Sequence, residues 1–321
     1  MARSFAVAVL GALAIAGSSG AIGAMSAACS ASSNGAGDVA GDGAASGTLD
    51  AAPTPAAADA DTGADDADAA SASCSVSEPV TLWVDDSAGY PTRIYVPASI
   101  DTKMGSFLFD MGSETTFIAT PDGTRDPVAD GGTATIGACA RSYQGRPYHS
   151  EDAHGLPNLG TYGADQVLAA HDARFDLEAG VLDRFLAADP VTAAWSATPI
   201  ERVNGSLLVR ITLDGVAVRL LVDTGNPDIL WLGQQKKPGD VESQTVDAQG
   251  NVLVIYQGSV TAGISPGRTE TLPVSRMPSF PYFEQRVASE FGGDVQGLFG
   301  VAALGSHFAF DTTKMVLLRK P

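Results

Sequence analysis

The sequence predicts an all-β fold made of two similar lobes, and three observations support that prediction. From residue 80 onward, short runs of β-branched and aromatic residues alternate with Gly, Pro and Asp at intervals of about 8–12 residues, as in mainly β domains. Segments with a helical pattern are few and short. A set of landmarks also occurs twice in the same order, which indicates an internal duplication.

The expected elements follow from these patterns in chain order. Strands are expected first where β-branched and aromatic side chains cluster, at residues 80–84, 92–96, 106–109 and 116–118. The clearest helical segments are residues 164–170, 281–290 and 302–306. All three are short, so we expect the helices to be additions to a framework of strands.

The internal repeat divides the chain into halves. In residues 94–118 and again in residues 207–230, a strand ending in Asp is followed by an apolar run into Asp-x-Gly and then by a second apolar strand. In residues 160–182 and 297–317, a segment with two Gly residues leads to a short helix, a strand ending in Asp, a turn and a final strand. The boundary falls in a stretch rich in Ala, Thr and Pro, so we expect an N-terminal lobe at residues 78–190 and a C-terminal lobe at residues 191–321.

The N-terminus has the features of a signal peptide, expected at residues 1–28. Arg3 provides a positive start, and residues 5–16 form a run of small apolar side chains. This run is shorter than the roughly 20 residues that span a bilayer. Residues 29–77 contain no aromatic residue and consist mainly of Ala, Gly, Ser and Asp. Such a composition cannot bury enough apolar surface to fold, so we expect a disordered linker.

The start of the mature chain has two interpretations. Residues 26–29 resemble a bacterial lipobox, in which Cys29 is diacylated, with Ser26 where Leu is usual; ordinary cleavage after Ala28 is the alternative. The chain has three cysteines, and both interpretations leave Cys74 and Cys139 to form a disulfide in an oxidising compartment. We expect an exported protein of the bacterial cell envelope, lipid-anchored to the outer membrane or cell surface.

The second Asp-x-Gly motif identifies a family resemblance. Two apolar residues precede Asp223-Thr224-Gly225, and an apolar-aromatic-Gly segment follows later, before a short helix. This pattern resembles the aspartic peptidases of the pepsin and retropepsin type, in which each of two lobes or subunits donates one Asp-Thr/Ser-Gly loop. The resemblance extends over about residues 80–321, and two copies in one chain imply a bilobal arrangement. It implies catalytic roles for Asp110 and Asp223, and supporting roles in the two loops for Gly112, Ser113, Thr224 and Gly225.

The resemblance implies a specific chemistry. Two adjacent carboxyl groups share one proton; the ionised one activates a water molecule and the protonated one donates to the peptide group. The first motif departs from the pattern, because Met111 has no hydroxyl to brace the pair. Two functions follow: an exported aspartic endopeptidase, or a peptide-binding surface lipoprotein that is catalytically weak or inactive. A peptidase that processes only its own linker is a third, weaker option.

The flap that covers the substrate in this family is weakly marked. Tyr143 or Tyr148 is a candidate flap aromatic, and an exposed loop tied down by Cys139 is the alternative. Residues 247–251 are expected to form the corresponding hairpin of the second lobe.

Other partners and sites are excluded by charge and spacing. The four His residues lack metal-ligand spacing, so neither a metal nor another cofactor is expected. The net charge of −18 argues against nucleic acid as a partner. The expected partners are a peptide or protein substrate and the membrane, and the protein is expected to be a monomer.

Overall fold

The computed structural model describes most of the predicted globular part. The described residues are 80–86, 88–120, 132–137, 139–147, 153–165, 173–184, 192–246 and 252–320. The predicted signal peptide and linker lie outside them, as do Cys29 and Cys74, and the side chain of Cys139 is not described. Lipidation and the disulfide therefore stay predictions. None of the helices in the described ranges has the length and apolar character needed to cross a membrane.

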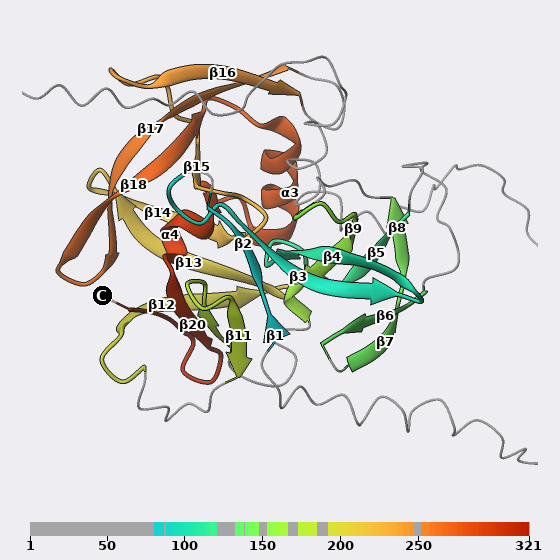
Figure 1. Cartoon of the computed structure of the whole chain (residues 1–321). Helices are drawn as coiled ribbons and strands as arrows, with labels where there is room; N and C mark the ends of the chain where they lie inside the picture. The colour runs from blue at the N-terminus through green and yellow to red at the C-terminus, as the bar shows by residue number, and fades with distance from the viewer. Residues whose placement is uncertain are drawn as a thin grey trace, which may run out of the picture. The chain divides into compact units, whose positions relative to one another are not determined.

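The first sheet is built entirely from the first half of the chain (Figure 1). Its strand order is β7-β6-β3-β4-β9-β5-β8, and β2 pairs with β3. The bounds are β2 (Trp83–Asp85), β3 (Arg93–Ile100), β4 (Lys103–Asp110), β5 (Phe117–Thr120), β6 (Gly132–Ile136), β7 (Cys139–Tyr143), β8 (Gly145–Pro147) and β9 (Asn158–Gly163).

The second sheet has the order β1-β11-β10-β20-β21-β12-β13-β14-β19-β15-β18-β17-β16. Three of its strands come from the first half, namely β1 (Val80–Thr81), β10 (Ala173–Asp176) and β11 (Val181–Arg184). The others are β12 (Ser196–Val203), β13 (Ser206–Leu213), β14 (Val216–Val222), β15 (Ile229–Leu232), β16 (Val241–Val246), β17 (Val252–Ser265), β18 (Arg268–Met277), β19 (Gly297–Phe299), β20 (His307–Asp311) and β21 (Val316–Arg319).

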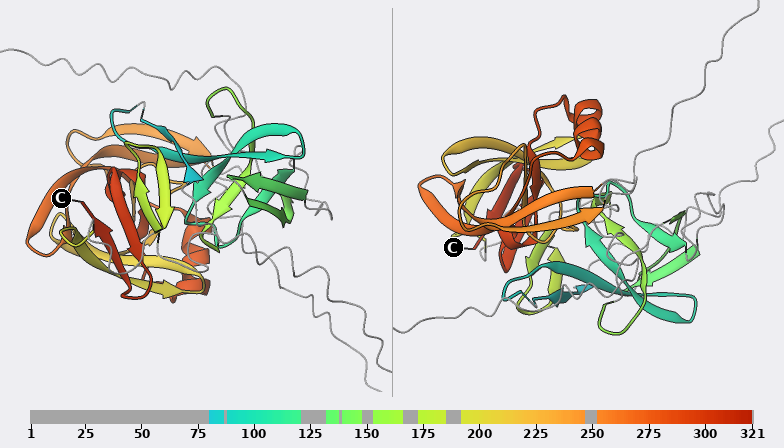
Figure 2. Two further views of the ribbon diagram at one scale, coloured as in Figure 1. Left: turned by 60° about the horizontal axis from the view of Figure 1, so that its bottom comes forward. Right: turned by 90° about the horizontal axis from the view of Figure 1, so that it is seen from above.

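The two halves are joined where β10 pairs with β20 (Figure 2). Phe175 of β10 lies opposite Phe308 of β20, and their rings stack with centroids 4.4 Å apart. Burial of such rings stabilises the folded state by about 1.5–3 kcal/mol each, so this pair ties the halves together. The predicted division between residues 190 and 191 thus runs through a sheet that both halves share.

The predicted duplication is confirmed by the strand pairing. In the first half, β9 is inserted between β4, to which it is parallel, and β5, to which it is antiparallel. In the second half, β19 is inserted in the same way between β14 and β15. The hairpins β3–β4 and β13–β14 both turn at an Asp with positive φ, Asp101 at 52° and Asp214 at 49°.

Glycine at equivalent positions makes the inserted strands fit. Gly160 lies in β9, where it pairs with Ile118 of β5, and Gly297 is the first residue of β19, where it pairs with Trp231 of β15. Both glycines have φ of 152°. A Cβ at these positions would fall on the carbonyl oxygens of Phe117 and Leu230, respectively. The neighbouring strand approaches too closely for any side chain there, so the repeat requires Gly at both sites.

Two of the predicted helices are present in the described residues. Helix α3 (Pro281–Phe291) begins with Pro281, whose ring suits the first helical position, and ends at Gly292 in the left-handed conformation. Helix α4 (Val301–Leu304) is shorter than expected and directly follows β19. Of the predicted helix at residues 164–170, only residues 164 and 165 are described, and both are helical.

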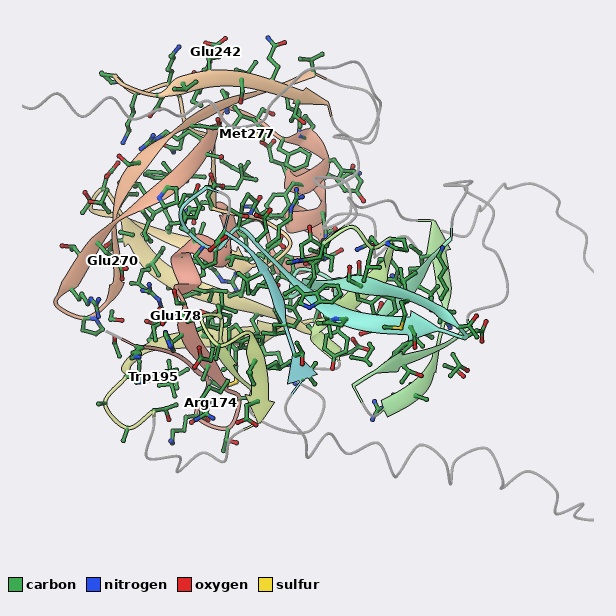
Figure 3. All side chains as sticks on the ribbon, viewed as in Figure 1. Arg174, Glu178, Trp195, Glu242, Glu270 and Met277 are labelled. Atoms are coloured by element: carbon green, nitrogen blue, oxygen red, sulfur yellow. The ribbon has the colours of Figure 1, made fainter. Side chains whose placement is uncertain are left out.

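The core has two main clusters of buried side chains. The larger one contains residues of both halves, including Phe107, Phe109 and Phe310. The second one lies between α3 and the second sheet; it includes Phe283 and Met277, which ends β18 and is labelled in Figure 3. The described residues therefore form an all-β, two-lobed fold with internal duplication and short helices, as predicted.

Candidate active site

Asp110 and Asp223 occupy equivalent ends of the two repeated strands. Asp110 is the last residue of β4, and Asp223 directly follows β14. The strands leading to them are buried and apolar, so each Asp is delivered from the core of its own half. Both aspartates are buried, with 1% of Asp110 and 0% of Asp223 exposed. We call residues 110–113 the first Asp loop and residues 223–226 the second Asp loop.

The two Asp loops have matching hydrogen bonds. The N–H of Gly112 donates to Oδ1 of Asp110 at 2.8 Å, and the N–H of Gly225 donates to Oδ1 of Asp223 at 2.9 Å. The fourth residue of each loop donates its N–H to the carbonyl oxygen of the Asp, at 3.2 Å in both cases. Each carboxyl group is thus held in place by its own loop, with one oxygen anchored by a backbone donor.

The glycines bring each loop against the carboxyl group of the other. A Cβ at Gly112 would lie 2.7 Å from Cγ of Asp223, and a Cβ at Gly225 would lie 3.0 Å from Cγ of Asp110. These contacts cross between the halves and are symmetric. They bring the two carboxyl groups together, and no side chain could replace either Gly without displacing a carboxyl group.

Thr224 braces the two loops through its side-chain hydroxyl. Its Oγ1 accepts the N–H of Met111 at 2.9 Å and donates to the carbonyl oxygen of Phe109 at 2.9 Å. The equivalent position in the first loop is Met111, which is fully buried and has no hydroxyl. One half of the symmetric brace is therefore present and the other half is replaced by apolar packing.

Both carboxyl groups of the pair have raised pKa values. Burial is the main cause that raises the pKa of both Asp110 and Asp223. The pKa of Asp223 is raised further by the negative charge of Asp110 and by the hydrogen bond between the two side chains, which lowers the pKa of Asp110. Asp223 is thus the partner that keeps its proton, and Asp110 is the one that ionises first.

The second carboxyl oxygen of Asp223, Oδ2, is consistent with this assignment. Among the described residues, no hydrogen-bond donor reaches Oδ2 of Asp223, although this atom is buried. A proton on Asp223 allows the side chain to act as a donor to the Asp110 carboxylate.

Asp228 is a buried carboxyl group near the second Asp loop that the sequence analysis missed. Burial raises the pKa of Asp228 to about 6. Ser275 of β18 donates to its Oδ2 at 2.8 Å, and the side-chain amide of Asn226 donates to its backbone oxygen at 2.5 Å. Asn226, the last residue of the second Asp loop, thus fixes the segment that follows.

Arg286 is the second residue that the sequence analysis missed. It lies on α3 with the buried residues Phe283, Val287 and Phe291, and only 6% of it is exposed. Its positive charge lowers the pKa of both Asp110 and Asp223. A signal was available in the sequence, because a charged residue within the apolar stripe of a predicted helix indicates a buried ion pair.

The flap role of Tyr143 stays a prediction. Tyr143 lies at the open end of the β6–β7 hairpin, and its ring packs edge-on against Phe107 with centroids 6.4 Å apart. It is partly buried against the larger core cluster, and burial raises its pKa. Tyr148 lies outside the described residues.

The duplication indicates a different first-half counterpart for the flap hairpin. Strands β16 and β17 pair on either side of residues 247–251, as expected for the hairpin of the second half. Strand β3 of the first half is equivalent to β13 of the second half. Because β6 pairs with β3 and β17 pairs with β13, β6 is the counterpart of β17. The first-half segment that corresponds to the hairpin therefore lies before β6. That segment, residues 121–131, is outside the described residues.

The described residues contain no grouping of His, Cys, Asp and Glu that could hold a metal ion. The candidate site thus consists of Asp110 and Asp223 with the two loops that carry them.

Comparison with known proteins gives a fold likeness alone. No protein-family model and no curated protein matches the chain. Among solved structures, the chain is similar to the crystal structure of aspartic proteinase from Irpex lacteus, with a TM-score of 0.42 and 12% sequence identity. The match covers 75% of this chain and 96% of that chain.

Proposed function

We propose that the protein is an exported aspartic endopeptidase, with Asp110 and Asp223 as its catalytic residues. The observation that carries the proposal is the symmetric approach of Gly112 to the Asp223 carboxyl group and of Gly225 to the Asp110 carboxyl group. This arrangement brings two buried carboxyl groups together at the ends of duplicated strands, which is the requirement for a pair that shares one proton.

The proposed reaction uses a water molecule bound between the two carboxyl groups. The Asp110 carboxylate takes a proton from this water while the water oxygen attacks the peptide carbonyl carbon. The Asp223 carboxylic acid donates its proton to the carbonyl oxygen, which gives a tetrahedral gem-diol. Asp110 then protonates the leaving nitrogen, and Asp223 recovers a proton as the carboxyl product forms. The C–N bond breaks, and the products are a carboxylic acid and an amine.

The division of roles follows from the pKa shifts. The reaction requires one protonated and one ionised carboxyl group at the same time. The pKa of Asp223 is raised well above its ordinary value, whereas the hydrogen bonds from Asp223 and from Gly112 oppose the effect of burial on Asp110. The singly protonated pair exists between the two titrations, so the activity should follow a bell-shaped pH profile.

The proposed location rests on the leader and the linker. Cys29 as a lipidated N-terminus would anchor the protein, and residues 30–77 would separate the two lobes from the membrane surface. Incorporation of radiolabelled palmitate into the wild type and into Cys29→Ser separates the two interpretations of the leader. If Cys29 carries lipid, the wild type should take up the label and C29S should not; if the chain is cleaved after Ala28, neither protein should take up the label.

Met111 favours a second candidate function, a peptide-binding lipoprotein with little or no catalysis. Its buried side chain takes the place of a bracing hydroxyl in the first Asp loop. If the two carboxyl groups are held loosely, the catalytic rate falls steeply, because catalytic groups must stay within about 0.5 Å of their working positions. Peptide binding depends less on this precision and would persist.

A single assay distinguishes the two functions. The full chain is incubated with a mixed peptide library from acid to neutral pH, and the products are identified by mass spectrometry. Asp223→Asn removes the proposed acid, and Asp101→Asn is the matched control, because Asp101 is exposed in a turn that Asn also accepts. The peptidase proposal expects cleavage by the wild type and by D101N but not by D223N. Peptides retained by the folded wild type without cleavage would instead favour the binding protein.

A further inference from the structure

Asp228 is a buried carboxyl group that the proposed reaction does not use. It lies two residues after the second Asp loop and directly before β15, and only 8% of it is exposed. A carboxyl group in such a place is unfavourable unless hydrogen-bond donors compensate its burial. The hydrogen bonds of Asp228 therefore indicate what this residue does.

The side chain of Asp228 is bonded to a neighbouring strand. Oγ of Ser275, in β18, donates to Oδ2 of Asp228 at 2.8 Å. Strand β18 is parallel to β15, and Ser275 pairs in register with Leu230, two residues after Asp228. The side-chain bond thus ties the segment between the second Asp loop and β15 to β18, just before the two strands begin their regular pairing.

The backbone of Asp228 is connected to the second Asp loop. The side-chain amide of Asn226 donates to the carbonyl oxygen of Asp228 at 2.5 Å, and the N–H of Asn226 donates to the carbonyl oxygen of Asp223 at 3.2 Å. On the other side, a Cβ at Gly300 would lie 2.1 Å from the carbonyl oxygen of Asp228, so the chain after β19 packs directly against it. A displacement of Asp228 would therefore be passed to Asp223 through Asn226.

The first half lacks this tie, although its backbone is built in the same way. Thr115 is the counterpart of Asp228, because a Cβ at Gly163 would lie 2.6 Å from the carbonyl oxygen of Thr115 just as one at Gly300 approaches that of Asp228. Ser113 closes the loop by donating its hydroxyl to the carbonyl oxygen of Thr115 at 2.8 Å. The side chains differ, because Oγ1 of Thr115 is buried and has no hydrogen-bond partner among the described residues. The side-chain bond to a neighbouring strand is thus a feature of the second half.

We propose that Asp228 is a positioning residue of the Asp110–Asp223 pair: its hydrogen bond with Ser275 fixes the second Asp loop to β18 and so holds the Asp223 carboxyl group beside that of Asp110. The proposal rests on the proposed peptidase function and names the group that holds one of its two catalytic residues. A misplacement of about 1 Å in such a group costs on the order of a hundredfold in rate, so a bond that fixes the loop matters for the reaction.

The test measures how the carboxyl pair titrates in the full chain. The chain is labelled with ¹³C at the Asp carboxyl groups, and the signals of the pair are identified by their loss in Asp110→Asn and Asp223→Asn. Two adjacent carboxyl groups titrate in two steps, and the separation between the steps decreases as the groups move apart. The loss of a charge elsewhere moves both steps in the same direction. The separation therefore reports the position of one carboxyl group relative to the other.

Four variants isolate the hydrogen bond. Ser275→Ala removes its donor and leaves the carboxyl group of Asp228 in place, whereas Asp228→Ala removes its acceptor. Asp228→Asn removes the charge and keeps an acceptor for Ser275. Ser206→Ala is the matched control, because Ser206 is also buried and its hydroxyl has no hydrogen-bond partner within the described part of the chain. Denaturant unfolding shows which variants are folded, and S275A provides the test should D228A fail to fold.

The separation between the two steps should decrease by on the order of one pH unit in S275A and in D228A. D228N and S206A should keep the separation of the wild type. A wild-type separation in folded S275A would overturn the proposal, as would equal changes in D228A and D228N, which would point to the charge instead of the hydrogen bond.

Kinetics give a second readout if the protein cleaves peptides. In S275A, kcat should then fall on the order of tenfold or more while KM stays within about twofold, because the bond positions a reacting group and does not contact the substrate. Equal kcat values for S275A and S206A would contradict the proposal. The titration needs no substrate, so a failure to cleave any peptide would count against the peptidase function and leave the role of Asp228 to be decided by the titration.

Discussion

The hydroxyl of Thr224 accepts the backbone N–H of Met111 at 2.9 Å and connects the two Asp loops across the halves of the chain. It also donates to the carbonyl oxygen of Phe109, so one side chain satisfies a donor and an acceptor of the opposite strand end. The two loops meet at this side chain and at the glycines that contact the carboxyl groups.

Thr224→Val should weaken both the fold and the site. The buried N–H of Met111 would lose its partner, at a cost of about 1–3 kcal/mol in the free energy of unfolding. Denaturant unfolding measures this cost, and kcat/KM measures the effect on the pair. Thr198→Val is the matched control, because buried Thr198 donates to the carbonyl oxygen of Ile264 far from the Asp loops in the sequence. Both variants should lose stability, but only T224V should lose activity; equal activity in the two would refute the bracing role.

Met111→Thr should increase activity. By the symmetry of the loops, a hydroxyl at position 111 would lie near the N–H of Thr224 and the carbonyl oxygen of Val222, and it would complete the brace. If the brace lowers the barrier by about 1.4 kcal/mol, kcat rises about tenfold. Met111→Val serves as the control, because it also removes volume from the core but adds no hydroxyl. A rate for M111T equal to that of M111V would show that the missing hydroxyl is unimportant.

Gly112→Ala should lower activity about a hundredfold by displacing a carboxyl group in the other half of the chain. The new Cβ would lie 2.7 Å from Cγ of Asp223, so the carboxyl group must move. A displacement of this kind costs about a hundredfold in rate. Gly132→Ala is the control, because its nearest contact, Cδ1 of Ile118, is 3.4 Å from the added Cβ. Comparable kcat/KM values for G112A and G132A would contradict the geometry.

Asp228 should make the protein less stable as the pH rises from about 4 to 6. Burial raises the pKa of Asp228 to about 6 in the folded state, whereas an unfolded Asp titrates near 4. The folded state therefore binds the proton more tightly, and its stabilising effect is present below pH 4 and lost as the pH rises through 6. A shift of this size corresponds to roughly 3 kcal/mol.

Asp228→Asn tests this dependence, because it removes the titration and keeps an acceptor for Ser275. The free energy of unfolding, measured by denaturant at several pH values, should decrease less between pH 4 and 6 in D228N than in the wild type. Parallel curves for the two proteins would rule out Asp228 as the source of the slope.

Much of the fold could be predicted from the sequence because the repeat leaves local marks. Gly160 and Gly297 are visible in the sequence, and both are required where an inserted strand meets its neighbour. Asp176 and Asp311 are likewise visible at strand ends, where each accepts a backbone N–H three residues later. These features depend on short-range sequence, so the pattern alone indicates them.

The remainder depends on contacts between distant residues, which no local pattern encodes. The pairing of β10 with β20 joins residues more than a hundred positions apart, and it gives the two halves a common sheet. The approach of Arg286 of α3 to Glu114, which follows the first Asp loop, is another such case, since the two residues lie far apart in the sequence. The edge-on packing of Tyr143 against Phe107 is a further contact of this kind, since the two residues lie on different strands.

The most direct test of the central claim is the kinetics of Asp110→Asn, Asp223→Asn and the double variant on one peptide that the full-length wild type cleaves. If the two carboxyl groups act as one unit, each single variant should lose on the order of a thousandfold or more in kcat, and the double variant should be no worse than either. Circular dichroism and denaturant unfolding would establish that all three proteins are folded. Cleavage at the wild-type rate by folded D110N or D223N would contradict the account.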